Sequence, residues 1–431
     1  MKKLLAITAF LQLFAYDPQA QPANNTGSPT LSVENQTYYD KQLIRYAMPN
    51  LVHLQFGQER DIPQKAGQKI NFRNFHSLGK MTEPLVEGVT PDPQSLVVTD
   101  IEATVRQYGG FVALTDMIDM TAIDPVVTEA VRLIGDQAGL SLDTIARDKI
   151  HADITNVAYA AKVSGGSETE VFYRYDLDET AKLTVKEIEK QFTELESQNA
   201  PKIDGYYICI THPKALYDLK RDPDWRNAQQ YTSEVSKIYK NEVGEIGGFR
   251  FITSSEAKIF KGANIPGNGN NGHTTLTVKT AITNATTSLV VSEIVLPSAV
   301  GRYILIPTTG GTVRRKITAA SANTDTTLTL DASVSNVSAG ATIYPGEGGA
   351  QNRAVFSALC FGANAYGKTK VEGGGLKTIV KPLGSGGTSD PLNQRSTVGW
   401  KSLLTAKVLI PEYIRRLEVG GTYATVAQIA N

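Results

Sequence analysis

The chain has 431 residues and carries 43 lysines and arginines against 43 aspartates and glutamates, so its formal net charge is zero. Proteins whose main task is to hold nucleic acid usually show a basic excess, and this balance argues against that class. Two cysteines, Cys209 and Cys360, are too few for a disulfide framework and form no metal-binding cluster with a histidine. No stretch approaches the roughly 18 uninterrupted apolar residues of a membrane span, so no membrane is expected as a partner.

The N-terminal residues favour an arm over part of a core. Residues 1–15, MKKLLAITAFLQLFA, join two lysines to an apolar run, as secretory signal peptides do. Gln12 interrupts that run, and the segment that follows lacks a clean A-x-A cleavage site. Residues 17–29 are rich in Pro, Asn, Gln and Gly, which is typical of a flexible linker. On these residues alone, secretion and an uncleaved arm both stay open.

Two segments with an extended pattern follow, at 62–78 and 97–108. In the second, side chains alternate with a period of two, and about 12 residues at 3.3 Å each reach about 40 Å. Pro84, Gly88 and Pro93 between the two segments suit a turn. A two-stranded arm of this length is marginally stable alone. We therefore expect it to lie against something else, such as another copy of the chain.

A long helix is predicted over 124–150. Asp124 is a suitable N-cap, and Pro125 stands at the first helical position, where its missing N–H is not needed. Apolar residues then recur at helical spacing for about 26 residues, or near 39 Å. Gly135 and Gly139 lower helix propensity, which suggests a close approach of another backbone.

The centre of the chain mixes helices and strands. Thr184 and Glu187 form the capping-box pattern of a second helix, and strands are predicted at 205–211, 249–253 and 354–361. This mixture indicates an α+β centre. From 263 to 350, Thr, Ser, Ala, Asn and Gly dominate, and short β-patterned runs recur about 10–15 residues apart. We interpret 263–350 as an all-β insertion.

One motif points to chemistry. Gly362–Thr369, GANAYGKT, matches a phosphate-binding loop, in which the lysine and threonine open a helix. Three consecutive glycines at 373–375 cannot continue such a helix, so we interpret the motif as a glycine-rich turn that leaves a strand. The histidines are scattered, and no nucleophile elbow is present. The sequence therefore predicts no catalytic residue, no cofactor and no metal, and the protein is not expected to be an enzyme.

Several segments together carry a family resemblance. They are TYYDKQLIRYAMPNLVHLQFGQ (37–58), EGVTP (87–91), TAIDPVVTEAVRLIGDQAG (121–139), LDTIARD (142–148), EAKIFKGA (256–263) and IVKPLGSGGTSDPLNQRSTVGWK (379–401). They resemble the major capsid proteins of tailed double-stranded-DNA bacteriophages related to the coat protein of phage N-four. LQLFA at 11–15 is similar to the start of many members, which favours the uncleaved arm. The resemblance covers most of 31–262 and 351–425.

The resemblance implies the Hong Kong 97-type capsid fold, which is α+β, with an all-β insertion domain added. The domains it implies are an N-terminal arm (1–60), an E-loop β-hairpin (61–113), a peripheral domain (114–200) with the spine helix 124–150, an axial domain in two parts (201–262 and 351–394) around the insertion (263–350), and a C-terminal return to the peripheral domain (395–431). Asp124 and Pro125 would then cap the spine helix.

The implied function is structural. Many copies would self-assemble into hexamers and pentamers of an icosahedral phage head, formed in the bacterial host cytoplasm, that encloses double-stranded DNA by weak non-specific contact. Scaffold, portal and decoration proteins are further implied partners, and the virion is the implied location. The alternative is a secreted or surface-layer β-rich structural protein, which the N-terminal lysines and the threonine-rich segment favour.

The predicted contacts between subunits lie on the two-stranded arm, which is the E-loop β-hairpin (61–113). We expect Phe72, Arg73 and Phe75 on its first strand, and Ile101 and Val105 on its second, to contact a neighbouring copy. The reason is that these residues, most of them apolar, stand on an arm that has no core of its own chain to fill.

Overall fold

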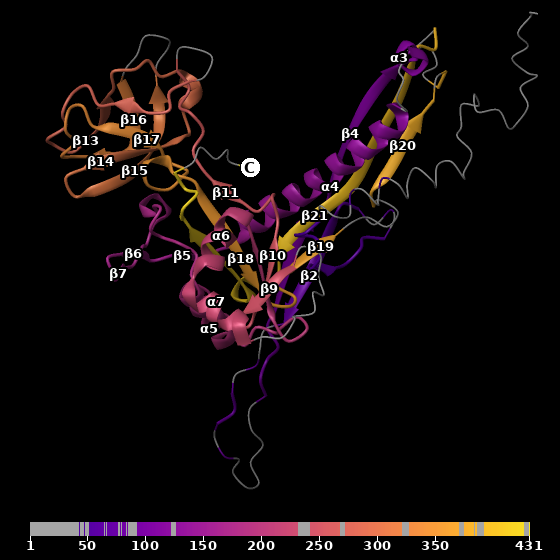
Figure 1. Ribbon diagram of the computed structural model, residues 1–431, viewed down its shortest axis with the longest axis horizontal. Helices are drawn as coiled ribbons and strands as arrows, with labels where there is room; N and C mark the ends of the chain where they lie inside the picture. The colour runs from indigo at the N-terminus through magenta and orange to yellow at the C-terminus, as the bar shows by residue number, and fades with distance from the viewer. Residues whose placement is uncertain are drawn as a thin grey trace, which may run out of the picture.

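The computed structural model describes residues 43, 47, 51–63, 65, 67–75, 78, 80–82, 84, 93–121, 126–231, 242–267, 272–320, 327–369, 375–382, 384–385, 392–425 and 431. A mixed sheet lies at the centre, a long helix with its own sheet rises on one side, and a separate six-stranded sheet lies on the other (Figure 1). No helix in these described parts is long and apolar enough to cross a membrane.

The central sheet has the strand order β5-β22-β18-β8-β10-β9, with β11 also beside β18. Its strands are β5 (Val157–Tyr159), β8 (Tyr207–Thr211), β9 (Glu242–Ile246), β10 (Phe249–Thr253), β11 (Ile259–Phe260), β18 (Val355–Phe361) and β22 (Ile414–Val419). Every residue of β8 and β18 is buried. The three strands predicted at 205–211, 249–253 and 354–361 are thus confirmed as neighbours in one sheet.

Helices cover both faces of the central sheet. Because successive side chains of a strand point to opposite faces, Tyr207 and Cys209 join a core with α5 (Val185–Ser197) and α6 (Pro213–Arg221). Ile208 and Ile210 join a second core with α4 (Val126–Asp153). The N-cap half of the predicted capping box is observed, since the Thr184 side chain accepts a hydrogen bond from the Glu187 N–H. A further helix, α7 (Pro223–Tyr231), follows α6.

The helix α4 corresponds to the helix predicted over 124–150, and it ends at Asp153. The predicted cap residues Asp124 and Pro125 lie outside the described residues. One face of α4 packs on a five-stranded sheet with the order β1-β19-β21-β20, in which β4 also pairs with β21. These strands are β1 (Gln58–Glu59), β4 (Arg106–Thr115), β19 (Tyr366–Thr369), β20 (Lys377–Lys381) and β21 (Arg395–Val408).

The single long strand predicted over 97–108 is wrong. The structure has two strands there, separated at Val105 and belonging to different sheets. β3 (Val98–Thr104) pairs with β2 (Lys69–Phe75) to form the arm hairpin, whereas β4 pairs with β21 over ten residue pairs. A period-two pattern shows that one face of a strand is buried, but it does not show which strand is the partner. The alternation therefore runs unbroken through a change of sheet.

The C-terminal segment also differs from the prediction. β21 lies against α4, as expected for a return to the helix, but β22 lies between β5 and β18 in the central sheet. Conversely, β19 and β20, which were assigned to the axial part 351–394, pair with β21. Both differences have one cause, because the residues of a strand do not specify which distant strand it pairs with.

The six-stranded sheet lies wholly within 263–350 and has the order β12-β17-β14-β15-β16-β13. Its strands are β12 (Leu276–Thr277), β13 (Thr286–Val290), β14 (Tyr303–Thr308), β15 (Gly311–Ala320), β16 (Thr327–Val334) and β17 (Thr342–Pro345). It has a hydrophobic core of its own, built from residues between Ile265 and Ile343. Its two ends meet where Gly262 and Asn352 exchange hydrogen bonds of 2.7 and 3.0 Å.

Short elements complete the fold. They are α3 (Asp116–Thr121), the hairpin of β6 (Lys162–Ser164) and β7 (Ser167–Thr169), and the 3-10 turns Arg174–Asp176, Pro297–Ala299, Ala350–Asn352 and Pro411–Tyr413.

Candidate inter-subunit surfaces

One face of the arm hairpin packs on the chain itself. Phe72 is only 4% exposed and shares a small core with Ala103 and Leu409, against which Ile101 also packs. A Cβ at Gly367 would lie 3.0 Å from the Phe72 ring, so the glycine leaves room for this close packing. Val105 is buried as well. The premise that these arm residues lack a core in their own chain is therefore wrong for Phe72 and Val105.

The opposite face of the hairpin is exposed and charged. Lys69 pairs with Glu102 at 2.7 Å, and Arg73 pairs with Asp100 at 3.5 Å. All four side chains are more than half exposed. Exposed ion pairs of this kind contribute about 0–1 kcal/mol to stability, so they leave these residues free to exchange partners.

The far end of the hairpin exposes large apolar side chains. Phe75 is 63% exposed, and Val98 stands opposite it in the strand register. Leu78, Met81, Leu96 and Val97 on the adjoining described residues are also exposed. We call Phe75, Leu78, Met81 and Leu96 to Val98 the arm end. Soluble monomers rarely expose so many large apolar residues close together along one hairpin, and such patches mark interaction sites.

A second exposed surface lies on the five-stranded sheet, on the face away from α4. The register places Phe111, Gly399 and Ile379 side by side across β4, β21 and β20. Phe111 is 75% exposed, and Ile379 is exposed as well. Lys377, Lys381 and Lys401 lie on the same face by their even spacing from Ile379 and Gly399. These three strands contain no aspartate or glutamate, so this outer sheet face is apolar at its centre and cationic around it.

The first part of the glycine-rich motif at 362–369 is a turn that leaves β18, as predicted, and its last four residues form β19. Lys368 and Thr369 lie in β19 instead of opening a helix. The Lys368 ammonium donates to the Leu54 carbonyl at 3.1 Å and pairs with Glu59 at 3.2 Å. The lysine thus fastens the chain around residue 54 to the sheet. Among the described residues, no group of three or more histidines, cysteines, aspartates or glutamates could hold a metal ion.

Residues 98–276 match the phage capsid protein family. The match covers less than half of the chain, and over that part the chain is similar to phage capsid proteins. The capsid of Ralstonia phage GP4 is 13% identical and has a TM-score of 0.50 over 96% of this chain and 98% of that one. The capsid of cyanophage P-SCSP1u is 11% identical and has a TM-score of 0.49 over 86% of this chain and 89% of that one. No curated protein sequence matches the chain.

The predicted Hong Kong 97-type α+β fold is confirmed, and the protein is a structural protein of a phage head. The family is a structural class without catalytic activity, so this capsid protein is not an enzyme. Its place is the virion. The match to the capsid family also favours this function over the secreted or surface-layer alternative.

A buried ionic cluster holds the capsid protein together where β22, the turn at Arg174 and β11 meet. Glu418 is fully buried, and its two carboxylate oxygens accept hydrogen bonds from Arg174 at 2.5 and 2.6 Å. Arg416 pairs with the same carboxylate at 2.9 Å. The Arg174 guanidinium lies 3.6 Å from the centre of the Phe260 ring. Burial lowers the pKa of Arg416 from its ordinary value, yet the group keeps its anionic partner.

Two buried histidines lie in the same region of the protein. His151, at the end of α4, contacts the Arg147 carbonyl and the Ser357 hydroxyl through its two ring nitrogens. Burial lowers its pKa well below the ordinary value. His212 caps α6 by accepting a hydrogen bond from the Lys214 N–H, and its ring stacks on Phe356. Burial lowers the pKa of His212 to about 4.

The sequence reasoning missed the outer sheet face and most of the arm end. Phe111 stands at an odd position of a strand whose even positions face α4, so the alternation in β4 was the available signal. The pairing of β4 with β21, whose partner residues are 280 or more positions away, had no signal in the sequence. Of the predicted contact residues, Arg73 and Phe75 are exposed, Ile101 is partly buried, and Phe72 and Val105 are buried.

Proposed function

We propose that the capsid protein self-assembles into hexamers and pentamers of an icosahedral head around double-stranded DNA, with each arm hairpin lying on a neighbouring copy. The exposed apolar arm end carries this proposal, because its own chain leaves Phe75 and Val98 uncovered. A contact between two different surfaces of identical chains repeats from copy to copy and closes into a ring when the rotation allows it.

The outer sheet face of the neighbouring copy is the surface that we propose for the arm end. Phe111 and Ile379 offer apolar area to Phe75 and Val98. Lysines around them suit the carboxylates of Asp100 and Glu102, which lie next to the arm end. Contact between these surfaces removes apolar area of both partners from water. Each Å² of apolar area buried in this way stabilises the contact by about 25 cal/mol. The charges set the orientation of the contact more than its strength.

Other partners of the proposed head follow from the same assignment. The zero net charge fits a shell that touches packaged DNA weakly, because strong phosphate binding requires a basic excess. Scaffold, portal and decoration proteins, and assembly in the host cytoplasm, belong to this proposal as further expectations.

Negative-stain electron microscopy of the purified chain tests the proposal at its coarsest level. We expect rings of five or six copies, or closed shells, at micromolar concentration. Chains that remain monomeric in sedimentation under all conditions that favour assembly would contradict it.

Crosslinking tests the proposed contact itself. Two chains are mixed, one with Phe75→Cys and one with Phe111→Cys, and treated with a short bis-maleimide. Native Cys209 and Cys360 are buried, so the introduced thiols react first. We expect a crosslinked dimer of unlike chains. Val300→Cys, which places the thiol on an exposed position of the six-stranded sheet domain, is the matched control. A dimer yield with Phe111→Cys that is no higher than with Val300→Cys would refute the contact.

A further inference from the structure

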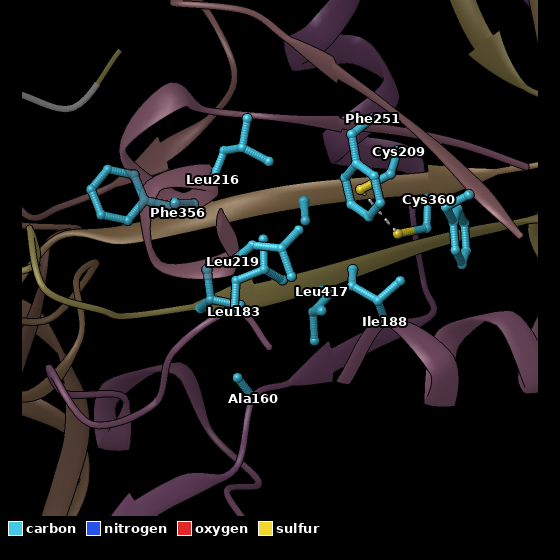
Figure 2. Packing of buried hydrophobic residues seen from close by; sticks show 14 of the residues in the cluster. Ala160, Leu183, Ile188, Cys209, Leu216, Leu219, Phe251, Phe356, Cys360 and Leu417 are labelled. Atoms are coloured by element: carbon cyan, nitrogen blue, oxygen red, sulfur yellow. Dashed lines mark hydrogen bonds between the residues drawn. The ribbon is translucent and has the colours of Figure 1, made fainter. Parts of the chain in front are cut away.

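The two cysteines of the chain lie side by side in the middle of the central sheet. Cys209 on β8 and Cys360 on β18 stand directly opposite each other in an antiparallel register. Their sulfur atoms are 3.6 Å apart, although the residues are 151 positions apart in sequence. Figure 2 shows the two thiols pointing toward each other among Phe251, Ile188 and Leu417. Both are free thiols and fully buried.

This placement suits a disulfide without a change of fold. Residues directly opposite in an antiparallel pair have Cα atoms about 4.5–5.5 Å apart, which lies within the 4.4–6.8 Å range that disulfides span. The sulfur atoms need only approach from van der Waals contact to bonding distance, which a small rotation about each Cα–Cβ bond achieves. The neighbouring strands β10 and β22 keep β8 and β18 in place.

The surroundings also keep the pair reduced while reductant is plentiful. The hydrogen bond with Cys360, and then burial, raise the pKa of the Cys209 thiol well above its ordinary value. Because the thiolate is the reactive form, the thiols react slowly and only when local opening of the sheet admits a small molecule.

We propose that Cys209 and Cys360 are a latent cross-strand disulfide, closed by a small peroxide once the chain is outside a reducing cytoplasm. One thiolate attacks a peroxide oxygen, so that an S–O bond forms, the O–O bond breaks and hydroxide leaves. The second thiolate then attacks that sulfur, the S–S bond forms, and a second hydroxide leaves. The two thiol protons and two hydroxides give two waters, and two electrons pass from sulfur to the peroxide.

Closing this bond joins the two central strands across the chain segment that contains the six-stranded sheet. Crosslinks that close long loops stabilise mainly by restricting the unfolded chain. The closed disulfide therefore raises the temperature at which the capsid protein unfolds once the particle is released into oxidising surroundings, where disulfides persist. The biological setting rests on the proposed function, whereas the chemistry is a property of the purified chain, so the two can fail separately.

The test treats the purified full-length chain with increasing hydrogen peroxide, then denatures it and alkylates the remaining thiols before intact-mass measurement. Met117 and Met120 are exposed, so their conversion to sulfoxides reports that the peroxide dose was sufficient. We expect that neither cysteine can then be alkylated and that formation of the disulfide lowers the mass of the chain by two hydrogens. The chain should stay monomeric on a non-reducing gel. The thermal unfolding midpoint should rise by several degrees and return after treatment with dithiothreitol.

Cys209→Ala and Cys360→Ala serve as the controls, because each leaves one thiol with no partner. Both should show no midpoint shift that dithiothreitol reverses. Two thiols that remain fully alkylatable after the methionines are oxidised would overturn the proposal. Conversion of the thiols to sulfinic acid, or to disulfides between chains, would overturn it as well.

Discussion

The central sheet and the arm hairpin use similar strands in opposite ways. All seven residues of β18 are buried, whereas β2, also seven residues long, buries only Phe72. The central strands are covered by helices on both faces, and the arm has one face on its own chain and one face exposed. The difference indicates that the residues that fold this capsid protein and those that assemble it occupy separate regions. Substitutions should therefore separate stability from assembly.

The largest effect on stability is expected in the buried ionic cluster. Glu418→Leu removes the anion between Arg174 and Arg416 and leaves a partly buried and a largely buried guanidinium group facing each other. We expect the free energy of unfolding to fall by about 3–5 kcal/mol, measured by urea denaturation at pH 7. Glu102→Leu on the arm, whose ion pair is exposed, is the matched control and should cost at most about 1 kcal/mol. Equal losses from both variants would contradict the contrast between the two regions.

Within the arm, the two phenylalanines of β2 should behave differently. Phe72→Ala removes a buried ring from the small core with Ala103 and Leu409, and we expect a loss of about 3 kcal/mol. Phe75→Ala removes an exposed ring and should change stability by no more than about 0.5 kcal/mol. Thermal unfolding of the unassembled chains measures both. If Phe75→Ala destabilised the monomer as much as Phe72→Ala, the arm end would not be free in the monomer.

Acid should lower the free energy of unfolding through the central region, where His212 and His151 are buried. The pKa of His212 is about 4 in the folded chain, against 6.5 ordinarily, so between these values the unfolded chain binds more protons. Stability is therefore complete above about pH 6.5 and falls as the pH drops toward 4, by up to about 3 kcal/mol. The lowered pKa of His151 acts in the same direction.

His212→Asn isolates this contribution, because asparagine keeps an acceptor for the helix cap but does not titrate. The slope of unfolding free energy between pH 6.5 and 4 should be smaller in the variant, measured by urea denaturation at each pH. An unchanged slope would show that protonation of His212 is not coupled to unfolding.

Local patterns predicted the elements better than their partners. The helical spacing from Val131 to Ile150 gave α4, and the apolar run before Gly362 gave β18, because both depend on neighbouring residues. The change of sheet at Val105 and the position of β22 depend on pairing between distant strands, which alternation does not specify. The outer sheet face at Phe111 was missed for the same reason. Packing of Phe72 depends on Leu409, which is more than 300 residues away.

We propose that the arm end holds the shell together without contributing to the folding of the subunit. The most direct test of this proposal is the double variant Phe75→Ser with Val98→Ser, compared by sedimentation and thermal unfolding with wild type and with Val300→Ser, an exposed turn position in the six-stranded sheet domain. We expect the double variant to unfold within about 1 °C of wild type while losing rings and shells, and Val300→Ser to assemble normally. Normal particles from the double variant, or loss of assembly only together with loss of folding, would contradict the account.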